Sequence, residues 1–177
     1  IRKFGKSVEL NSKVIQLPSS KQSLMASLDG KIVKYYVKEG DLVKKGDKVA
    51  LIQSIELSRM SAEYLALKEQ LKSMEENYNG NLILNKRDIV SKQELNLLNI
   101  QRKDIAAKLE TIISQLKTLD IEVKDIKNTI SEYTLFAHNS GIVSSLLKTE
   151  YSAVSKDTEI VSIVKEKSFY LKSYLPI

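Results

Sequence analysis

Hydrophobic residues follow two different spacings along the chain, and the spacing changes twice. From Leu24 to Ile52 apolar and polar residues alternate, and the alternation returns from Leu135 to Ile163. A period of two is typical of half-buried β-strands. Between these stretches the apolar residues are spaced 3-4-3-4, which is typical of helices that pack along one seam. The pattern therefore predicts two β regions separated by a helical insert.

The two β regions are copies of each other. With an offset of 111 residues, 24–52 aligns with 135–163 without a gap, and seven of the 29 positions are identical. Because one or two hairpins alone bury too little apolar area, we expect the copies to close a single core, as one flattened β-sandwich. The identical pairs are Leu24/Leu135, Ala26/Ala137, Gly30/Gly141, Glu39/Glu150, Val43/Val154, Lys45/Lys156 and Ile52/Ile163.

Two turns distinguish the copies. The first copy has Gly40 and Gly46, and the second has Tyr151 and Asp157 at the equivalent positions. Glycine adopts positive φ without a steric penalty, whereas a bulky side chain does not. We therefore expect the turns of the second copy either to differ or to be slightly strained.

The insert predicts an antiparallel helical hairpin. If the two helices fold back on each other, the numbers of facing residues have a constant sum, and the pairs from Leu57/Leu119 to Tyr78/Leu98 all give 176. The turn is then centred on Asp88. About 31 residues at ~1.5 Å each give a rod of about 45 Å. The predicted seam consists of Leu57, Met60, Tyr64, Leu67, Leu71, Met74, Tyr78, Leu98, Arg102, Ile105, Leu109, Ile112, Leu116 and Leu119.

Two polar positions in the hairpin carry further predictions. Ser91, with Glu94 three residues later, predicts a cap at the start of the second helix. Arg102 is the only polar seam residue, and we expect it to face Met74 with Glu75 or Glu76 within reach of its guanidinium. Such an arginine either fixes the register of the seam or belongs to a functional site.

Composition excludes several classes of function. The chain is 42% hydrophobic and 28% charged, with a net charge of +6. Its basic residues are scattered among 22 acidic ones rather than gathered into a stripe, so nucleic-acid binding is not expected. A single histidine, the absence of cysteine and the lack of a phosphate-binding glycine loop argue against an enzyme. The chain begins and ends in strand-like sequence, so we expect it to be a fragment.

Metal ligands are also scarce. His138, beside Asn139 and Ser140, is most simply a turn residue before a strand. Thioethers bind soft cations, but the three methionines are on separate elements, and core packing is their simplest role. We expect no metal site in this part of the protein.

The β copies resemble the two halves of a lipoyl or biotinyl domain. LDGKIVKYYVKEGDLVKKGDKVALI is similar to the first half, and YTLFAHNSGIVSSLL to the I-x-A-P-x-x-G-x-V opening of the second, matched at Ala137, Gly141 and Val143. A lipoyl-type domain split by a helical hairpin resembles the periplasmic adaptor, or membrane fusion protein, of tripartite RND-type efflux pumps. There the hairpin replaces the lysine-bearing turn, so the resemblance implies no lipoate or biotin and no other cofactor.

Two segments of the hairpin make the resemblance more specific. SIELSRMSAEYLALKEQL is similar to the S-P-E-L-x-x-A-x-x-E-Y-L segment of the heavy-metal subgroup, which favours metal cations over drugs as the cargo. At the turn, adaptors that dock on outer-membrane channels carry R-x3-L-x6-S followed by leucine; Gly80 occupies the arginine position here. The resemblance implies a docking tip made of Leu84, Arg87, Asp88, Ile89, Ser91 and Leu95.

The expected fold class is α+β: a lipoyl-like β-sandwich split by a coiled-coil hairpin, plus strands of an incomplete β-barrel domain. The resemblance implies a non-enzymatic adaptor in the periplasm, associated with the inner membrane. Its partners would be an RND-type transporter, an outer-membrane channel and further copies in a hexameric ring. A drug-efflux adaptor, a type I secretion adaptor and a lipoyl-like carrier or structural coiled-coil protein remain alternatives. Residues 21–53 and 131–166 are expected to be the two lipoyl-like halves, and 54–130 the helical hairpin with a short return helix. Residues 1–20 and 167–177 are expected to belong to the adjoining β-barrel domain.

Overall fold

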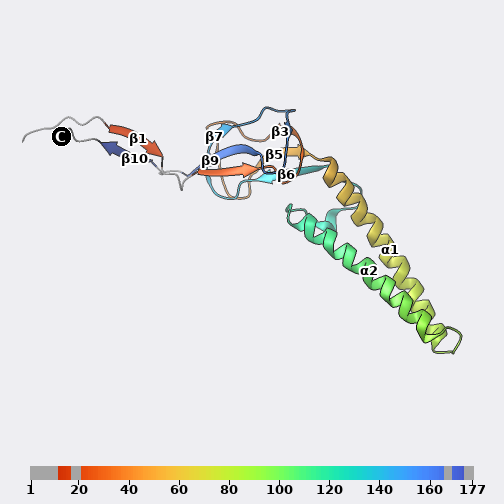
Figure 1. The fold of residues 1–177 in the computed structure, drawn as a ribbon. Helices are drawn as coiled ribbons and strands as arrows, with labels where there is room; N and C mark the ends of the chain where they lie inside the picture. The colour runs from red at the N-terminus through yellow and green to blue at the C-terminus, as the bar shows by residue number, and fades with distance from the viewer. Residues whose placement is uncertain (1–11, 17–20, 166–168, 174–177) are drawn as a thin grey trace, which may run out of the picture.

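The computed structural model describes residues 12–16, 21–165 and 169–173. Within these ranges the chain forms two long helices, two four-stranded antiparallel sheets and a two-stranded ribbon (Figure 1). The helices project together from one side of the sheets, and the ribbon lies on the other side (Figure 1). No helix in the described part of the chain is both long enough and apolar enough to cross a membrane.

The two sequence copies give two equivalent sets of strands, and each strand of the second copy starts 111 residues after its counterpart. The first set is β2 (Lys21–Met25), β3 (Gly30–Tyr35), β4 (Leu42–Val43) and β5 (Lys48–Gln53). The second set is β6 (Glu132–Phe136), β7 (Gly141–Leu146), β8 (Ala153–Val154) and β9 (Glu159–Val164).

The copies exchange strands to build the two sheets. One sheet has the order β2-β9-β7-β4 and the other β6-β5-β3-β8, so each contains two strands from each copy. Their buried side chains form one cluster, which includes Leu24, Ile52 and Val143 at 2% exposure or less. Neither copy therefore completes a sheet or a core without the other.

The structure explains why glycine occupies the same position, Gly30 and Gly141, in both copies. A Cβ added to Gly30 would clash with the backbone oxygen of Gln53, and one added to Gly141 would lie 2.5 Å from that of Val164. The two contacts are equivalent in the two copies, because both partners differ by the same offset. Glycine is thus required at both positions by the close approach of a neighbouring strand.

The turns of the second copy are strained rather than different. Tyr151 and Asp157 have φ values of 65° and 63°, and Gly40 and Gly46 have 90° and 91°. The turn is retained because its backbone pairs with the other copy. Gly40 N donates to Val143 O at 2.8 Å, and Tyr151 N donates to Ile32 O at 2.8 Å.

The insert forms α1 (Ile55–Asn85) and α2 (Lys92–Lys117), followed by the short 3-10 helix η2 (Val123–Asp125). Residues 86–91 connect the helices, and Asp88 within them has φ 58°. The predicted cap is confirmed, because the Ser91 hydroxyl accepts from Glu94 N at 3.1 Å. Ser54 caps α1 in the same way, accepting from Leu57 N.

The ribbon pairs the two ends of the chain. Strand β1 (Ser12–Gln16) is antiparallel to β10 (Phe169–Ser173). Both strands fall in the segments 1–20 and 167–177 that were expected to adjoin a β-barrel domain; residues 1–11, 17–20, 167–168 and 174–177 of those segments lie outside the described ranges.

Candidate functional site

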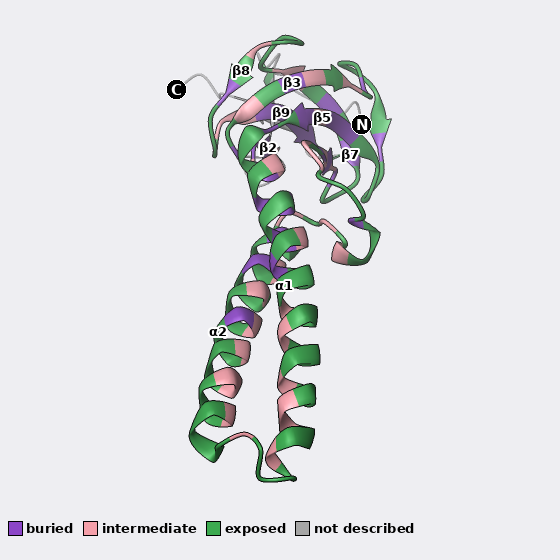
Figure 2. Cartoon of the chain, turned by 90° about the vertical axis from the view of Figure 1, so that its right-hand side faces the viewer, coloured by how far each residue is buried: buried purple, intermediate pink, exposed green. Residues whose placement is uncertain are grey.

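The hairpin seam is most buried next to the sheets. All fourteen predicted seam residues are buried or half-buried. Figure 2 shows that the buried segments of both helices lie near the β domain, and that burial decreases toward the turn. The buried members are Leu57, Met60, Tyr64, Leu67, Ile105, Ile112 and Leu116. The half-buried members are Leu71, Met74, Tyr78, Leu98, Arg102, Leu109 and Leu119.

Arg102 has a different partner from the one expected. Its guanidinium carbon lies 4.9 Å from the centroid of the Tyr78 ring, and its Nη2 donates to Asn99 Oδ1 at 3.1 Å. The ion pairs within the described residues join Lys21 to Glu159 and Lys108 to Asp104, so the predicted pairing with Glu75 or Glu76 is wrong. The planar guanidinium stacks on the tyrosine because the ring lies in the same half-buried seam, whereas both glutamates are exposed.

The turn of the hairpin carries apolar side chains in contact with solvent. Of the predicted docking residues, Ile89 is 66% exposed and Leu84 is 37% exposed, and both Arg87 and Asp88 are exposed. Ser91 is exposed, but its hydroxyl caps α2. Leu95 is half-buried. The predicted docking residues therefore present a small apolar surface with one positive and one negative side chain, and the exposed Lys86 and Lys92 add two positive charges beside them.

Three more exposed apolar residues extend this surface, and the sequence interpretation did not include them. They are Ile83, at 55% exposure, and Leu97 and Ile100, at 56% and 64%. Leu97 and Ile100 line a hollow of about 510 Å³ on α2 together with Ser91, Gln93, Glu94 and Asn96. All three fall outside the heptad positions of the seam. The sequence could have indicated them, because each is an apolar residue at a helix position that the seam does not use.

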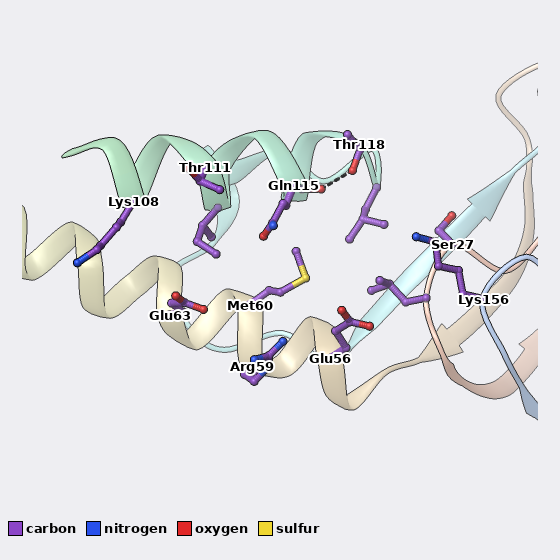
Figure 3. A pocket seen from close by; sticks show the side chains of 13 residues that line it. Ser27, Glu56, Arg59, Met60, Glu63, Lys108, Thr111, Gln115, Thr118 and Lys156 are labelled. Carbon is purple, nitrogen blue, oxygen red and sulfur yellow. Dashed lines mark hydrogen bonds between the residues drawn. The ribbon is translucent and has the colours of Figure 1, made fainter. Parts of the chain in front are cut away.

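A second hollow lies at the base of the hairpin, where both helices meet the β domain (Figure 3). It measures about 500 Å³. In Figure 3 the Met60 thioether and the Gln115 amide point toward each other across its floor. Its charged lining has both signs: Glu56, Arg59, Glu63, Lys108 and Lys156. The described residues contain no cluster of three metal-ligating His, Cys, Asp or Glu side chains.

The base of the hairpin is fixed to the β domain through α1. The buried Ser61 hydroxyl accepts from Ile130 N at 3.0 Å and lies 3.0 Å from Ile130 O, to which it donates. One helical turn further, Tyr64 donates to Val123 O at 3.3 Å. Ser54 N donates to Ser131 O at 2.7 Å. The segment that returns from α2 is thus bonded to the first turns of α1, and strand β5 enters α1 directly at Ser54.

Three titratable side chains of the β domain have shifted pKa values. Burial, with a smaller effect of the Glu150 charge, raises the pKa of Tyr35 to about 12. Burial also raises the pKa of Tyr133, whose hydroxyl is bonded to the Leu28 backbone. The Ser23 hydroxyl and then Lys21 lower the pKa of Glu159. Each of these three side chains thus has a hydrogen-bond partner within the β domain.

Solved structures share the fold of this chain. ZneB from Cupriavidus metallidurans aligns with a TM-score of 0.70 and 14% identity, over 92% of this chain and 67% of its own. The membrane fusion protein Spr0693 from Streptococcus pneumoniae R6 aligns with a TM-score of 0.55 and 19% identity, over 93% and 67%. The chain has the fold of membrane fusion proteins.

Another solved structure, described as a putative efflux transporter from Bacteroides eggerthii DSM 20697, aligns with a TM-score of 0.59 and 20% identity. The alignment covers 99% of this chain but only 51% of that protein. The sequence itself matches no family model and no curated protein. The membrane fusion protein fold is therefore established by structure rather than by sequence.

Proposed function

We propose that the chain is part of a non-enzymatic periplasmic adaptor that links an inner-membrane RND-type transporter to an outer-membrane channel. The observation that carries this proposal is the hairpin, which projects from the β domain and ends in exposed apolar residues. Helix α1 has 31 residues, which gives a length of about 46 Å. A compact core does not need a rod of this length, whereas a bridge between two membrane proteins does.

The tip would be the surface that docks on the channel. Leu84 and Ile89 supply apolar contact area, and Arg87 and Asp88 flank them with opposite charges that can restrict the orientation of a partner. Ser91 would contribute indirectly, because its bond to Glu94 N fixes where α2 begins. Leu95, being half-buried, would support the turn rather than form its outer surface.

Metal cations are the proposed cargo. The support is the opening of α1, where Ser54, Glu56, Leu57, Glu63, Tyr64 and Leu65 match the heavy-metal subgroup of adaptors. Two of these residues have defined structural roles. Ser54 caps the helix, and Tyr64 holds the return segment. We further propose that residues 21–53 and 131–166 form one lipoyl-like unit, that 54–130 form the hairpin, and that 1–20 and 167–177 belong to an adjoining β-barrel domain.

Cells that produce the full-length protein provide the test. Deletion of its gene should lower tolerance to divalent metal cations, and expression of the intact gene should restore it. A variant in which residues 55–130 are replaced by a short linker should be produced but fail to restore tolerance. Loss of tolerance to drugs alone would overturn the metal assignment. Full activity of the variant without the hairpin would overturn the adaptor role itself.

A further inference from the structure

The two copies within the β domain have the same arrangement of strands, but their exposed surfaces differ in charge. Sheet β6-β5-β3-β8 displays Lys31 and Lys34 on β3 and Lys48 at the start of β5. In the other sheet the equivalent positions are Ile142, Ser145 and Glu159. Because the same backbone forms with either set, folding does not require three lysines here.

The three lysines lie on the same side of their sheet. Lys31 and Lys34 are three residues apart, which places side chains on opposite sides of a regular strand. Strand β3 has a register shift between Ile32 and Lys34, and the extra residue returns Lys34 to the side of Lys31. Buried Ile32 and Val37 mark the opposite side, which faces the core.

Two exposed tyrosines lie beside these lysines. The Nζ atoms of Lys34 and Lys48 are 4.7 Å and 6.0 Å from the centroid of the Tyr36 ring. The Nζ atom of Lys31 is 5.3 Å from the centroid of Tyr151. We call these five residues, Lys31, Lys34, Tyr36, Lys48 and Tyr151, the cationic face. Tyr151 is the tyrosine with φ 65°, in the turn whose backbone pairs with Ile32.

The lysines of the cationic face have no carboxylate partner among the described residues, where the ion pairs are Lys21–Glu159 and Lys108–Asp104. Several carboxylates border the face, and two of them, Asp29 and Glu56, line a hollow together with Lys31. Glu132 is on β6, and Glu150 accepts from Tyr35 N at 3.0 Å. On the other sheet Lys21 lies 3.1 Å from Glu159, so its charge is neutralised within the chain. The three ammonium groups of the cationic face are therefore available to the carboxylates of a partner.

We propose that the cationic face docks an acidic surface of a different protein. Three lysines can pair with carboxylates one by one, and exposed tyrosines are enriched at protein interfaces. Recognition of an anionic membrane typically uses clusters of about four to eight basic residues. Binding along nucleic acid typically neutralises about six to ten phosphates. The face is too small for either. It lies on the β domain rather than at the hairpin tip, so the proposal goes beyond the channel contact and stands without it.

Equivalent positions in the two copies provide a matched experiment. The photoreactive residue p-benzoylphenylalanine replaces Tyr36, 41% exposed, or Leu147, its equivalent at 44%, in the full-length protein in living cells. Irradiation should produce an adduct with another protein from position 36, and mass spectrometry should place the cross-link within an Asp/Glu-rich surface. Position 147 should not give that adduct.

Charge reversal gives the second readout. Lys34→Glu with Lys48→Glu should lower the yield of the adduct at least tenfold. Lys68→Glu with Lys72→Glu on α1 should not, although Lys68 also lies over a tyrosine ring. If the reversed variant does not fold, Lys34→Gln with Lys48→Gln replaces it. The proposal is overturned by an adduct with lipid, nucleic acid or a second copy of this chain. It is equally overturned by no adduct at position 36, or by a yield that charge reversal leaves unchanged.

Discussion

Glu39 and Glu150 make the same contact in opposite directions between the two β copies. Glu39 Oε1 accepts from Leu146 N at 2.9 Å, and Glu150 Oε1 accepts from Tyr35 N at 3.0 Å. Each carboxylate thus satisfies a backbone donor of the other copy. This reciprocity gives a physical reason for an identical glutamate in two otherwise divergent turns.

Removing either carboxylate should have the same effect on stability. Glu39→Ala and Glu150→Ala should each lower the free energy of unfolding by about 0.5–1.5 kcal/mol, the usual net value of one hydrogen bond. The double variant should lose about the sum, because the two bonds share no atoms. Urea unfolding followed by circular dichroism measures this, with Glu132→Ala as the control. A much larger loss in one variant would contradict the equivalence of the two contacts.

Two glycines with open surroundings should respond to alanine in opposite directions. No atom lies within 4 Å of a Cβ added at Gly40 or Gly80. Gly80 is inside α1, so Gly80→Ala should raise stability by about 1 kcal/mol. Gly40 has φ 90°, so Gly40→Ala should lower stability by about 1 kcal/mol. Thermal unfolding of both variants measures these two opposite changes in stability. A gain at Gly40 would show that the turn tolerates another conformation.

The hairpin should loosen at its base when one hydroxyl is removed. Ser61→Ala leaves Ile130 N without its acceptor in a part-buried site, which should cost about 1 kcal/mol. The return segment should detach from α1 more often, and trypsin should cut faster after Lys124 and Lys127. The exposed Ser73→Ala on the same helix is the control. Unchanged cleavage in Ser61→Ala would mean that other contacts hold the segment.

The positions of the strands and helices could be predicted from the sequence, but the neighbours of each strand and the contact of Arg102 could not. A constant offset places equivalent strands, because positions such as Gly30 and Gly141 are restricted by the same close approach. Alternation identifies a strand but not its neighbour, so the orders β2-β9-β7-β4 and β6-β5-β3-β8, in which each sheet mixes strands of both copies, were not predictable. Heptad spacing finds seam residues, but a guanidinium is long enough to reach a ring one turn away. Arg102 shows this.

Some of the candidate functional residues could be predicted from the sequence, and others could be found only in the structure. Leu84 and Ile89 are near the turn that the seam register implies, so a search around Asp88 finds them. Nothing in the sequence identifies Ser61, because the sequence around a helical serine does not show whether its hydroxyl is exposed or bonded to a distant backbone. The lysines of the cationic face alternate with apolar residues as in any half-buried strand. Only the comparison of equivalent positions in the folded copies separates them from ordinary surface lysines.

The tip prediction compares two isoleucines near opposite ends of α1. Ile89→Ser should leave the thermal stability unchanged, because the side chain is 66% exposed, but should weaken binding to the purified outer-membrane channel about tenfold, or ~1.4 kcal/mol. Ile55→Ser makes the same change at the 88% exposed first residue of α1 and should leave binding unchanged. Surface plasmon resonance with the full-length protein measures both. Equal affinity of the two variants would place the channel contact away from the turn.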